Sequence, residues 1–463
     1  MNTRRSLLKR SGLSGLGAGL LALALVGCDT ASLVELEDPD QITGPVARDP
    51  ENINELRNGA LYEFARAVAG PAQNNATPGI VGLTGVMTDE LWFSSTFPTM
   101  KEIDARNIDV TNSNLRTAYQ YIHRARNMAD RVIEQYDAAG KANTEDHALV
   151  TNLSGFSTIF LAENFCSGVP LSSTSLTGEL EFGPGQTTEE LVDLAIERFD
   201  AAIARAVAAG SEEQEFVARI GKARALQIVG EFAAAAAEVA SVPTDFVYEV
   251  AYSDNASGQG NGVWYNINSE RRSSAATGEG RNGIEFFARG DTASTVNTID
   301  PRVPVDSIGF GSGSQILPHY RQHKYDDRGV GIPLASGIEA RLIEAEAALA
   351  LGQSAAYLST LNELRAEIEL TAEAGLPALT DPGTPEARVL QFFEERAFWL
   401  WLTGHRLADL RRLVKFYGFD ADDVFPTGQT IDGTPYGSDV NFPIPFQEQN
   451  NPDFTGQCFD RNA

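Results

Sequence analysis

Apolar residues recur with the period of an α-helix through most of this chain. The first apolar face follows Asp49-Pro50-Glu51 and contains Ile53, Leu56, Ala60, Phe64 and Ala67. The same spacing predicts further helices over residues 114–136, 146–165, 187–208, 212–229, 232–240, 339–351 and 355–368. Thr187 and Glu190 stand at capping-box spacing at the start of one of them. The pattern therefore predicts a mainly α-helical protein.

Two of the predicted helix pairs resemble each other. Each pair is broken by one glycine, Gly230 in the first and Gly352 in the second. Aligning the two glycines brings similar residues together: Ala223 with Ala345, Ala225 with Ala347 and Val229 with Leu351. Small residues and a turn glycine let two helices approach closely, as in tetratricopeptide-like repeats. We therefore expect helix pairs of that kind.

The apolar run from Ala397 to Leu402 is too long for a stripe that faces a single neighbour. Thr384-Pro385-Glu386 begins this predicted helix with a cap, a first-turn proline and an acid, and Gly404 is placed to end it. A charged helix is predicted to follow. We expect four of its residues to have structural and not catalytic roles: His405, Arg406, Asp409 and Arg412.

Residues 243–332 break the helical pattern. They are rich in glycine, serine and asparagine, and only 246–252 is predicted to be a strand. A loop-rich insertion of this length usually carries function or is disordered. We expect ligand-binding residues here.

The chain is acidic, with 63 Asp and Glu against 36 Lys and Arg and a net charge of −27. Such a charge disfavours nucleic acid as a partner and suits neutral or cationic ligands, or a salty habitat. No phosphate-binding glycine loop, zinc-protease motif or nucleophile elbow is present. His319 and His323 have metal-like spacing, but a structural or solvated role is the better interpretation. We predict no enzyme activity, no cofactor and no metal.

Residues 1–27 have the pattern of an export signal, with four basic residues followed by the apolar run Leu13 to Val26. Leu25-Val26-Gly27-Cys28 resembles a bacterial lipobox, which implies cleavage before Cys28 and its acylation. An ordinary cleaved signal is the alternative. Residues 28–48 are then a lipidated tether, and two or more acyl chains would hold the protein to a membrane.

The export route and the final membrane leaflet stay open. Thr3-Arg4-Arg5 and the residues after it resemble a twin-arginine signal, although general secretion is equally compatible with them. Asp29 follows the lipid cysteine, a position at which aspartate retains some lipoproteins in the inner membrane.

Motifs along the whole chain resemble those of the SusD/RagB family. The C-terminal signature is Glu395-Arg396, the apolar helix, Gly404-His405-Arg406 and then Asp409 to Arg412. Further motifs occur in the family's order: Thr88-Asp89-Glu90, Gly168-Val169-Pro170-Leu171, Asp300-Pro301-Arg302, Lys324-Tyr325 and Phe442-Pro443-Ile444-Pro445. Trp399 and Thr403 depart from it, because many members have glutamate there, and Ser336 replaces a usual arginine.

The resemblance implies a SusD-like fold, with tetratricopeptide-like helix pairs forming a superhelical scaffold, long irregular loops and a few short strands. Residues 49–463 would be a single domain with the insertion at about 243–332. The protein would be lipid-anchored in the outer membrane and exposed at the cell surface. It would capture oligosaccharides, or alternatively peptides, for a SusC-like TonB-dependent transporter. A glycan-degrading envelope enzyme and a helical-repeat scaffold lipoprotein without a small ligand are the other hypotheses.

Sugar sites need flat aromatic surfaces surrounded by amides and carboxylates. Two segments offer that mixture, Trp92-Phe93 after Asp89-Glu90 and Trp264-Tyr265 among asparagines. In SusD-like proteins the corresponding loops form the binding face. The predicted ligand-binding residues are Trp264, Tyr265, Trp92, Phe93 and Tyr320, with Trp264 first among them; Tyr325 is a weaker candidate.

Cys166 and Cys458 remain once Cys28 is lipidated. In an exported protein an isolated pair is often bonded, so we predict a disulfide between them. Two buried free thiols are the alternative.

Overall fold

The computed structural model describes residues 52–463 without 175–178, 293–294, 315, 368–375, 455 and 457. The predicted signal peptide, Cys28 and the tether therefore lie outside the described residues. So does the last residue of the predicted 355–368 helix. The described residues belong to one compact unit, 44–463. None of the helices described has the length and apolar composition needed to span a bilayer.

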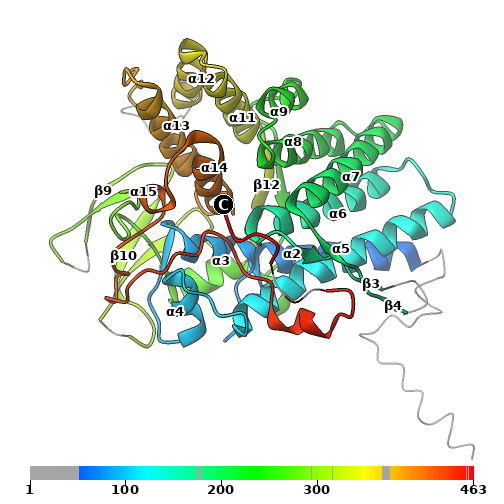
Figure 1. Ribbon diagram of the computed structural model, residues 1–463, viewed down its shortest axis with the longest axis horizontal. Helices are drawn as coiled ribbons and strands as arrows, with labels where there is room; N and C mark the ends of the chain where they lie inside the picture. Colours follow the sequence, from blue (N-terminus) through cyan, green and yellow to red (C-terminus); the bar gives the residue numbers. More distant parts are fainter. Residues whose placement is uncertain are drawn as a thin grey trace, which may run out of the picture. The chain divides into compact units, whose positions relative to one another are not determined.

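Long helices form the scaffold (Figure 1). They are α2 Ile53–Ala69, α5 Ser113–Ala138, α6 Glu145–Asn164, α7 Thr188–Ala209, α8 Glu212–Ile228, α9 Phe232–Val239, α11 Gly337–Ala350, α12 Ser354–Glu367, α13 Pro385–Trp399 and α14 Arg406–Tyr417. Shorter helical segments are α3 Ile80–Met87, α4 Pro98–Asp104, α10 Gly262–Trp264, α15 Ala421–Val424, η2 Ser257–Gln259, η3 Tyr265–Ser269 and η4 Phe446–Asn450. The prediction of a mainly α-helical fold is confirmed.

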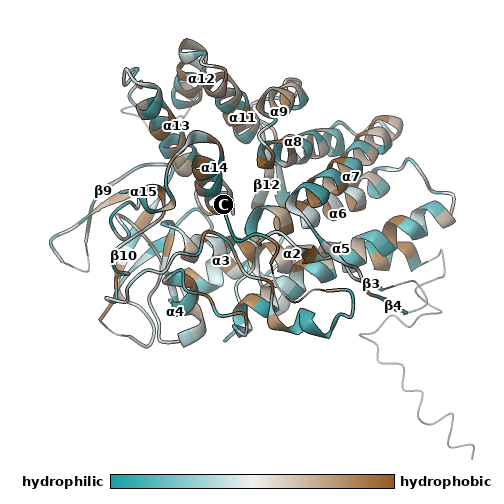
Figure 2. Ribbon diagram, in the orientation of Figure 1, coloured by the Kyte–Doolittle hydropathy of each residue, from teal (hydrophilic) through white to brown (hydrophobic). Residues whose placement is uncertain are grey.

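Consecutive helices pack against one another as repeat pairs. α5 contacts α6, α6 contacts α7, α8 contacts α9, and α9 also contacts α11 of the next pair. Gly230 and Gly352 both have positive φ, 80° and 70°, which explains why a glycine ends the first helix of each pair. Thr187 and Glu190 form the predicted capping box. Polar and apolar residues share most of the long helices, because one side of these helices faces the core (Figure 2). The exception is α6, which is buried on nearly all sides.

In the described part of the chain, the strands are short and form six two-stranded antiparallel ladders. The ladders pair β1 Leu91–Phe93 with β7 Ser273–Ala275, β2 Val169–Pro170 with β5 Gly185–Gln186, β3 Ser173–Thr174 with β4 Leu180–Glu181, β6 Val247–Val250 with β12 Ile332–Ser336, β8 Phe287–Arg289 with β9 Val296–Ile299, and β10 Val305–Phe310 with β11 Pro318–Gln322. The predicted strand 246–252 corresponds to β6. Within 243–332 the sequence missed the other strands, because ribbons of three to six residues carry little periodicity.

The helix predicted to run through Leu402 ends earlier, at Trp399. Leu402 has a left-handed backbone with φ 56°, so the helix cannot continue through it. Its amide donates to Glu90 Oε1 at 2.8 Å, and its carbonyl accepts from the Tyr325 hydroxyl at 2.9 Å. Lys324 Nζ donates to the Trp401 carbonyl at 2.6 Å. Residues of the Asp89-Glu90 and Lys324-Tyr325 motifs thus hold this turn.

The charged residues of α14 lie in a buried ion-pair network. Asp409 accepts from Arg396 and Arg412, each at 2.9 Å, and Arg412 also pairs with Glu346 at 2.9 Å. Two further pairs join distant motifs: Arg406 with Asp89 at 2.7 Å and His405 with Glu339 at 2.9 Å. These contacts support the structural role expected for the charged residues of this helix.

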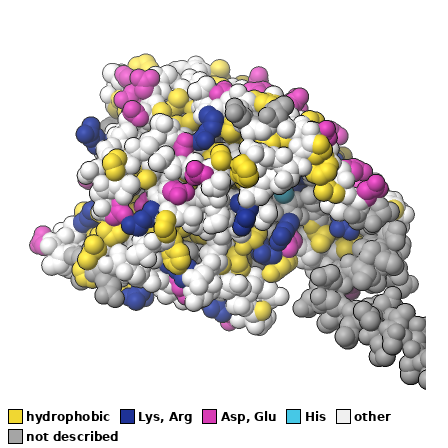
Figure 3. Space-filling view, turned by 60° about the horizontal axis from the view of Figure 1, so that its bottom comes forward, with side chains coloured by type: hydrophobic (Ala, Val, Ile, Leu, Met, Phe, Trp, Pro, Cys, Tyr) yellow, Lys and Arg dark blue, Asp and Glu magenta, His cyan; other side chains and the backbone are white. Residues whose placement is uncertain are grey.

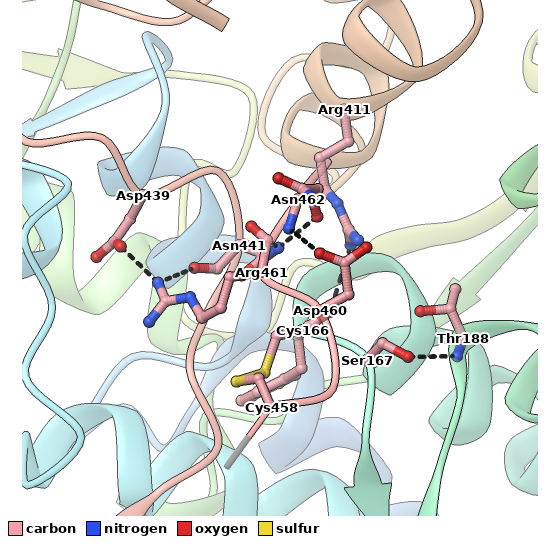
Figure 4. The surroundings of a disulfide bond; sticks show 11 residues. Cys166, Ser167, Thr188, Arg411, Asp439, Asn441, Cys458, Asp460, Arg461 and Asn462 are labelled. Atoms are coloured by element: carbon pink, nitrogen blue, oxygen red, sulfur yellow. Dashed lines mark hydrogen bonds and ion pairs between the residues drawn. A yellow bond between two sulfur atoms is a disulfide. The ribbon is translucent and has the colours of Figure 1, made fainter.

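Cys166 and Cys458 form a disulfide in the structure, with their Cα atoms 5.8 Å apart (Figure 4). The bond joins Cys166, two residues after the end of α6, to the C-terminal segment. Backbone hydrogen bonds run beside it, from Cys166 to the Phe442 carbonyl at 2.9 Å and from Ser167 to the Asp460 carbonyl at 3.1 Å. The C-terminal segment is therefore attached to the scaffold by covalent and polar contacts together.

Candidate functional site

The β1–β7 ladder brings the two predicted ligand segments together. Phe93 pairs with Ser273, and directly beyond this pair the Ser94 amide donates to the Arg272 carbonyl at 2.7 Å. A third loop joins them, since the Ser312 amide donates to the Arg271 carbonyl at 2.7 Å. At Gly311 a Cβ atom would lie 2.3 Å from the Ser94 carbonyl oxygen, so only glycine allows this approach. Three loops, 94–97, 264–272 and 308–314, thus meet at one surface.

Three predicted ligand residues lie inside the core and not on this surface. Trp92, Phe93 and Tyr320 are 0%, 2% and 1% exposed. Trp92 Nε1 donates to the Pro318 carbonyl at 3.1 Å, and its ring meets the Tyr320 ring edge-on at 5.7 Å. These three side chains therefore offer no exposed surface to a ligand in this structure. Their aromatic character reflects packing under the loops, which a sequence cannot distinguish from a binding surface.

His319 is likewise structural. It is buried, with Ser94 Oγ 2.9 Å from Nδ1 and the Ile267 carbonyl 2.8 Å from Nε2. Burial lowers the pKa of His319 to about 4, so the ring is neutral at pH 7. Among the described residues no group of three or more His, Cys, Asp or Glu side chains is arranged to hold a metal ion.

Trp264 and Tyr265 are half-buried on the converging loops. Asn261 begins this short helical segment by accepting from the Trp264 amide at 3.0 Å. Trp264 packs against the core, and its ring lies 6.3 Å from that of Tyr265. The Tyr265 hydroxyl donates to Glu270 Oε1 at 2.9 Å. Burial and this hydrogen bond raise the pKa of Tyr265.

Polar and aromatic groups continue from Tyr265 along the surface. Glu270 pairs with Arg272 at 2.9 Å, and the Arg272 guanidinium lies 4.8 Å from the Phe97 ring centroid. At the other end the Arg328 guanidinium lies 5.5 Å from the Tyr265 ring centroid. We call these five residues, Arg328, Tyr265, Glu270, Arg272 and Phe97, the Tyr265–Phe97 row.

Two amides flank the row. Arg272 Nη2 donates to Asn74 Oδ1 and to Asn75 Oδ1, both at 2.7 Å, and both asparagines are exposed. Phe97 is 41% exposed. The sequence analysis missed Phe97, Arg272 and the asparagines. Their signal was weak, since each stands in an irregular segment whose partners are about 200 residues away, as the separation of 198 between Arg272 and Asn74 shows.

An open depression adjoins the loops that carry the row. Its volume is ≈ 620 Å³, and it is lined by Arg271 and residues 308–313. Phe310, on its wall, is 46% exposed. Hydrophobic and basic side chains lie side by side on the face that comes forward in Figure 3. An exposed aromatic ring beside cations and amides can bind the apolar face and the polar rim of a sugar.

A second hollow, of ≈ 300 Å³, lies between α2 and β6. Its lining is mostly apolar, and two of its polar groups already have partners. The Tyr252 hydroxyl donates to the Ala65 carbonyl at 3.0 Å, and Arg66 pairs with Glu63 at 3.3 Å. The Tyr265–Phe97 row is the better candidate, because it combines the exposed Phe97 ring and the half-buried Tyr265 ring with several polar groups.

No protein-family model and no curated protein matches this chain. Solved structures do match. A SusD superfamily protein from Bacteroides vulgatus has a TM-score of 0.60 and 15% identity, covering 88% of this chain and 98% of its own. A SusD-like carbohydrate binding protein from Bacteroides fragilis has a TM-score of 0.60 and 14% identity, covering 89% and 99%. Surface glycan-binding protein A from Bacteroides uniformis has a TM-score of 0.61 and 14% identity, covering 89% and 100%.

The chain has a SusD-like fold. The predicted architecture of helix pairs with long loops and short strands is thereby confirmed. The SusD-like scaffold places the Tyr265–Phe97 row on loops that leave the helices, where binding residues are commonly found.

Proposed function

We propose that this protein is a cell-surface lipoprotein that binds oligosaccharides and passes them to a TonB-dependent outer-membrane transporter. The observation that carries the binding step is the Tyr265–Phe97 row, with two exposed asparagines beside it. The SusD-like fold supports it, since solved proteins of this fold are described as carbohydrate or glycan binding.

Anchoring, partner and location belong to the proposal as well. Cys28 in its lipobox-like setting supplies the anchor, and a SusC-like barrel is the partner that the sequence resemblance implies. An adjacent reading frame that encodes such a barrel, and co-purification of the two proteins, would support the transport step. Absence of both would favour a scaffold lipoprotein.

Binding without turnover is the expected activity. The charged residues of the family-like motifs are engaged in the buried network, as Asp409 with Arg396 and Arg412 illustrates. Incubation with plant and microbial glycans should therefore leave the glycans intact. Products of hydrolysis would favour the enzyme hypothesis.

The binding test uses full-length lipoprotein in detergent with a panel of plant and microbial oligosaccharides, measured by titration calorimetry. Tyr265→Ala and Phe97→Ala should each weaken binding of the recognised glycan by about 1–3 kcal/mol, the loss typical of a stacked ring. Trp264→Ala should also weaken binding, because Trp264 supports the Tyr265 ring.

Phe182→Ala is the matched control. Phe182 is 43% exposed, close to the 41% of Phe97, and lies between β4 and β5, outside the converging loops. Its removal should leave affinity unchanged. Equal losses in Phe97→Ala and Phe182→Ala, or unchanged binding after loss of both Tyr265 and Phe97, would show that the row is not the site.

A further inference from the structure

Two arginines, Arg271 on one converging loop and Arg328 beside the Tyr265 ring, have no ion pair among the described residues. Arg271 is exposed in the ≈ 620 Å³ depression, and Arg328 lies over the Tyr265 ring. Among the described residues neither forms a salt bridge or a side-chain hydrogen bond with another residue. Most other arginines in the described part of the chain are paired with acids, as Arg272, Arg321 and Arg388 are. These two positive charges are therefore available to a ligand.

The acidic composition of the chain bears on what the two arginines can bind. Acids outnumber basic residues 63 to 36. The long-range electrostatic field of such a negatively charged protein repels anions. An anionic ligand would need local guanidinium groups to overcome that repulsion, whereas a neutral sugar would gain little from them.

The backbone at Arg271 supports a specific role. Its φ of 54° is left-handed, a conformation that costs energy for a residue with a side chain. The Ser312 amide donates to its carbonyl at 2.7 Å and fixes this conformation. The loop therefore holds the Arg271 side chain in the depression, near the exposed Phe310 ring on its wall.

We propose that the site takes acidic oligosaccharides, with carboxylate or sulfate groups, and that Arg271 and Arg328 pair with those groups. This inference rests on the proposed function of the Tyr265–Phe97 row. Planar guanidinium groups form two parallel hydrogen bonds to carboxylate and favourable contacts with sulfate oxygens. The Phe97 and Tyr265 rings would meet the apolar faces of the sugar units, and Asn74 and Asn75 their hydroxyl groups. The net negative charge of the chain favours neutral or cationic ligands, whereas the two unpaired arginines at the proposed site favour anionic ones.

The test compares probes that differ only in charge. Oligogalacturonides are set against their methyl esters, and carrageenan oligosaccharides against the same chains after desulfation. The full-length lipoprotein should bind at least one acidic probe about tenfold or more tightly than its neutral counterpart, since hydrogen bonds to charged groups are the stronger ones. Raising NaCl from about 50 mM to about 500 mM should weaken binding of the acidic probe more than binding of the neutral probe, because salt screens exposed charges.

Three variants identify the residues. Arg271→Gln should reduce affinity for the acidic probe by about tenfold and leave affinity for the neutral probe unchanged. Arg328→Gln should reduce affinity for the acidic probe by about tenfold more than it reduces affinity for the neutral probe, because Arg328 also contacts the Tyr265 ring of the row. Arg124→Gln is the control, since Arg124 is an exposed residue of α5 without an ion pair among the described residues. It should change neither affinity.

The outcomes separate this inference from the function on which it rests. Neutral probes that bind as tightly as acidic ones, with dependence on Tyr265 and Phe97, would overturn the charge preference and keep the glycan-binding proposal. Acidic binding that is insensitive to Arg271→Gln and Arg328→Gln would also overturn it. Absence of binding to every probe and to the wider glycan panel would overturn both.

Discussion

At the scale of single residues, many of the family-like motifs have structural roles. Glu90 of the Thr88-Asp89-Glu90 motif is buried, and its carboxylate accepts a hydrogen bond from the Leu402 amide. Burial raises the pKa of Glu90 to about 8 and lowers that of Lys324 to about 8. The sequence could identify these motif residues, but it could not distinguish a residue that supports the fold from one that contacts the ligand. The hydrogen-bond distances and the exposed fractions of the side chains make that distinction.

Asp409 gives the test of a structural role. Burial alone would raise the pKa of Asp409, but the Arg396 and Arg412 guanidiniums outweigh it and hold the pKa below its usual range. Removing one partner of a buried ion pair typically costs about 3–5 kcal/mol. Asp409→Asn should therefore lower the melting temperature at pH 7, while glycan affinity of the folded protein is unchanged.

The pH dependence has a defined sign. A carboxyl with a lowered folded-state pKa stabilises the protein above its unfolded-state pKa, and this stability is lost as pH falls through the folded-state value. The difference in melting temperature between wild type and Asp409→Asn should therefore shrink below about pH 4, near the ordinary aspartate pKa. A difference that stays constant from pH 7 to acid, or a loss of affinity with unchanged stability, would contradict the structural role.

At the scale of elements, the sequence predicted those elements in which apolar residues recur with a clear helical period. The long helices were found because their apolar faces repeat over several turns. The Thr187–Glu190 box and the two turn glycines fixed helix ends for the same local reasons. The short strands other than β6 were missed, and so were the members of the Tyr265–Phe97 row other than Tyr265. The segments that carry Phe97 and Tyr265 are brought together by the β1–β7 ladder, and that pairing has no local signal.

The disulfide is the element-scale contact that a direct measurement can check. Peptide mapping without reductant should recover Cys166 and Cys458 in one linked fragment. The loop it closes is long, with a sequence separation of 292, so the bond could stabilise the protein by roughly 5 kcal/mol in the chain-entropy model. Reduction, or Cys166→Ala with Cys458→Ala, should lower the melting temperature. Complete alkylation of both thiols in unreduced protein would contradict the bond.

At the scale of the whole molecule, the described residues contain the proposed glycan site but not the proposed anchor. The scaffold, the ion-pair network and the row all lie within 52–463, while Cys28 lies in the segment before them. None of the described helices can hold the protein to a membrane by spanning it. Membrane attachment in our proposal therefore depends on Cys28 and its acyl chains.

Cys28→Ala tests that dependence. The wild type should partition into the membrane fraction and the detergent phase, because two or more acyl chains bind a bilayer stably. The variant should lose the lipid and appear in the soluble fraction with the same melting temperature, since Cys28 precedes the scaffold. Cys166→Ala is the control: it removes a cysteine of the same chain and should leave membrane attachment intact. Retention of Cys28→Ala in the detergent phase would show that another segment holds the protein.

Because Asp29 follows the acylated position, Asp29→Asn should be compared with wild type for protease access on intact cells. If protease on intact cells cleaves both the wild type and Asp29→Asn, the protein lies at the cell surface in spite of Asp29. Delivery of captured glycans to an outer-membrane transporter requires this location.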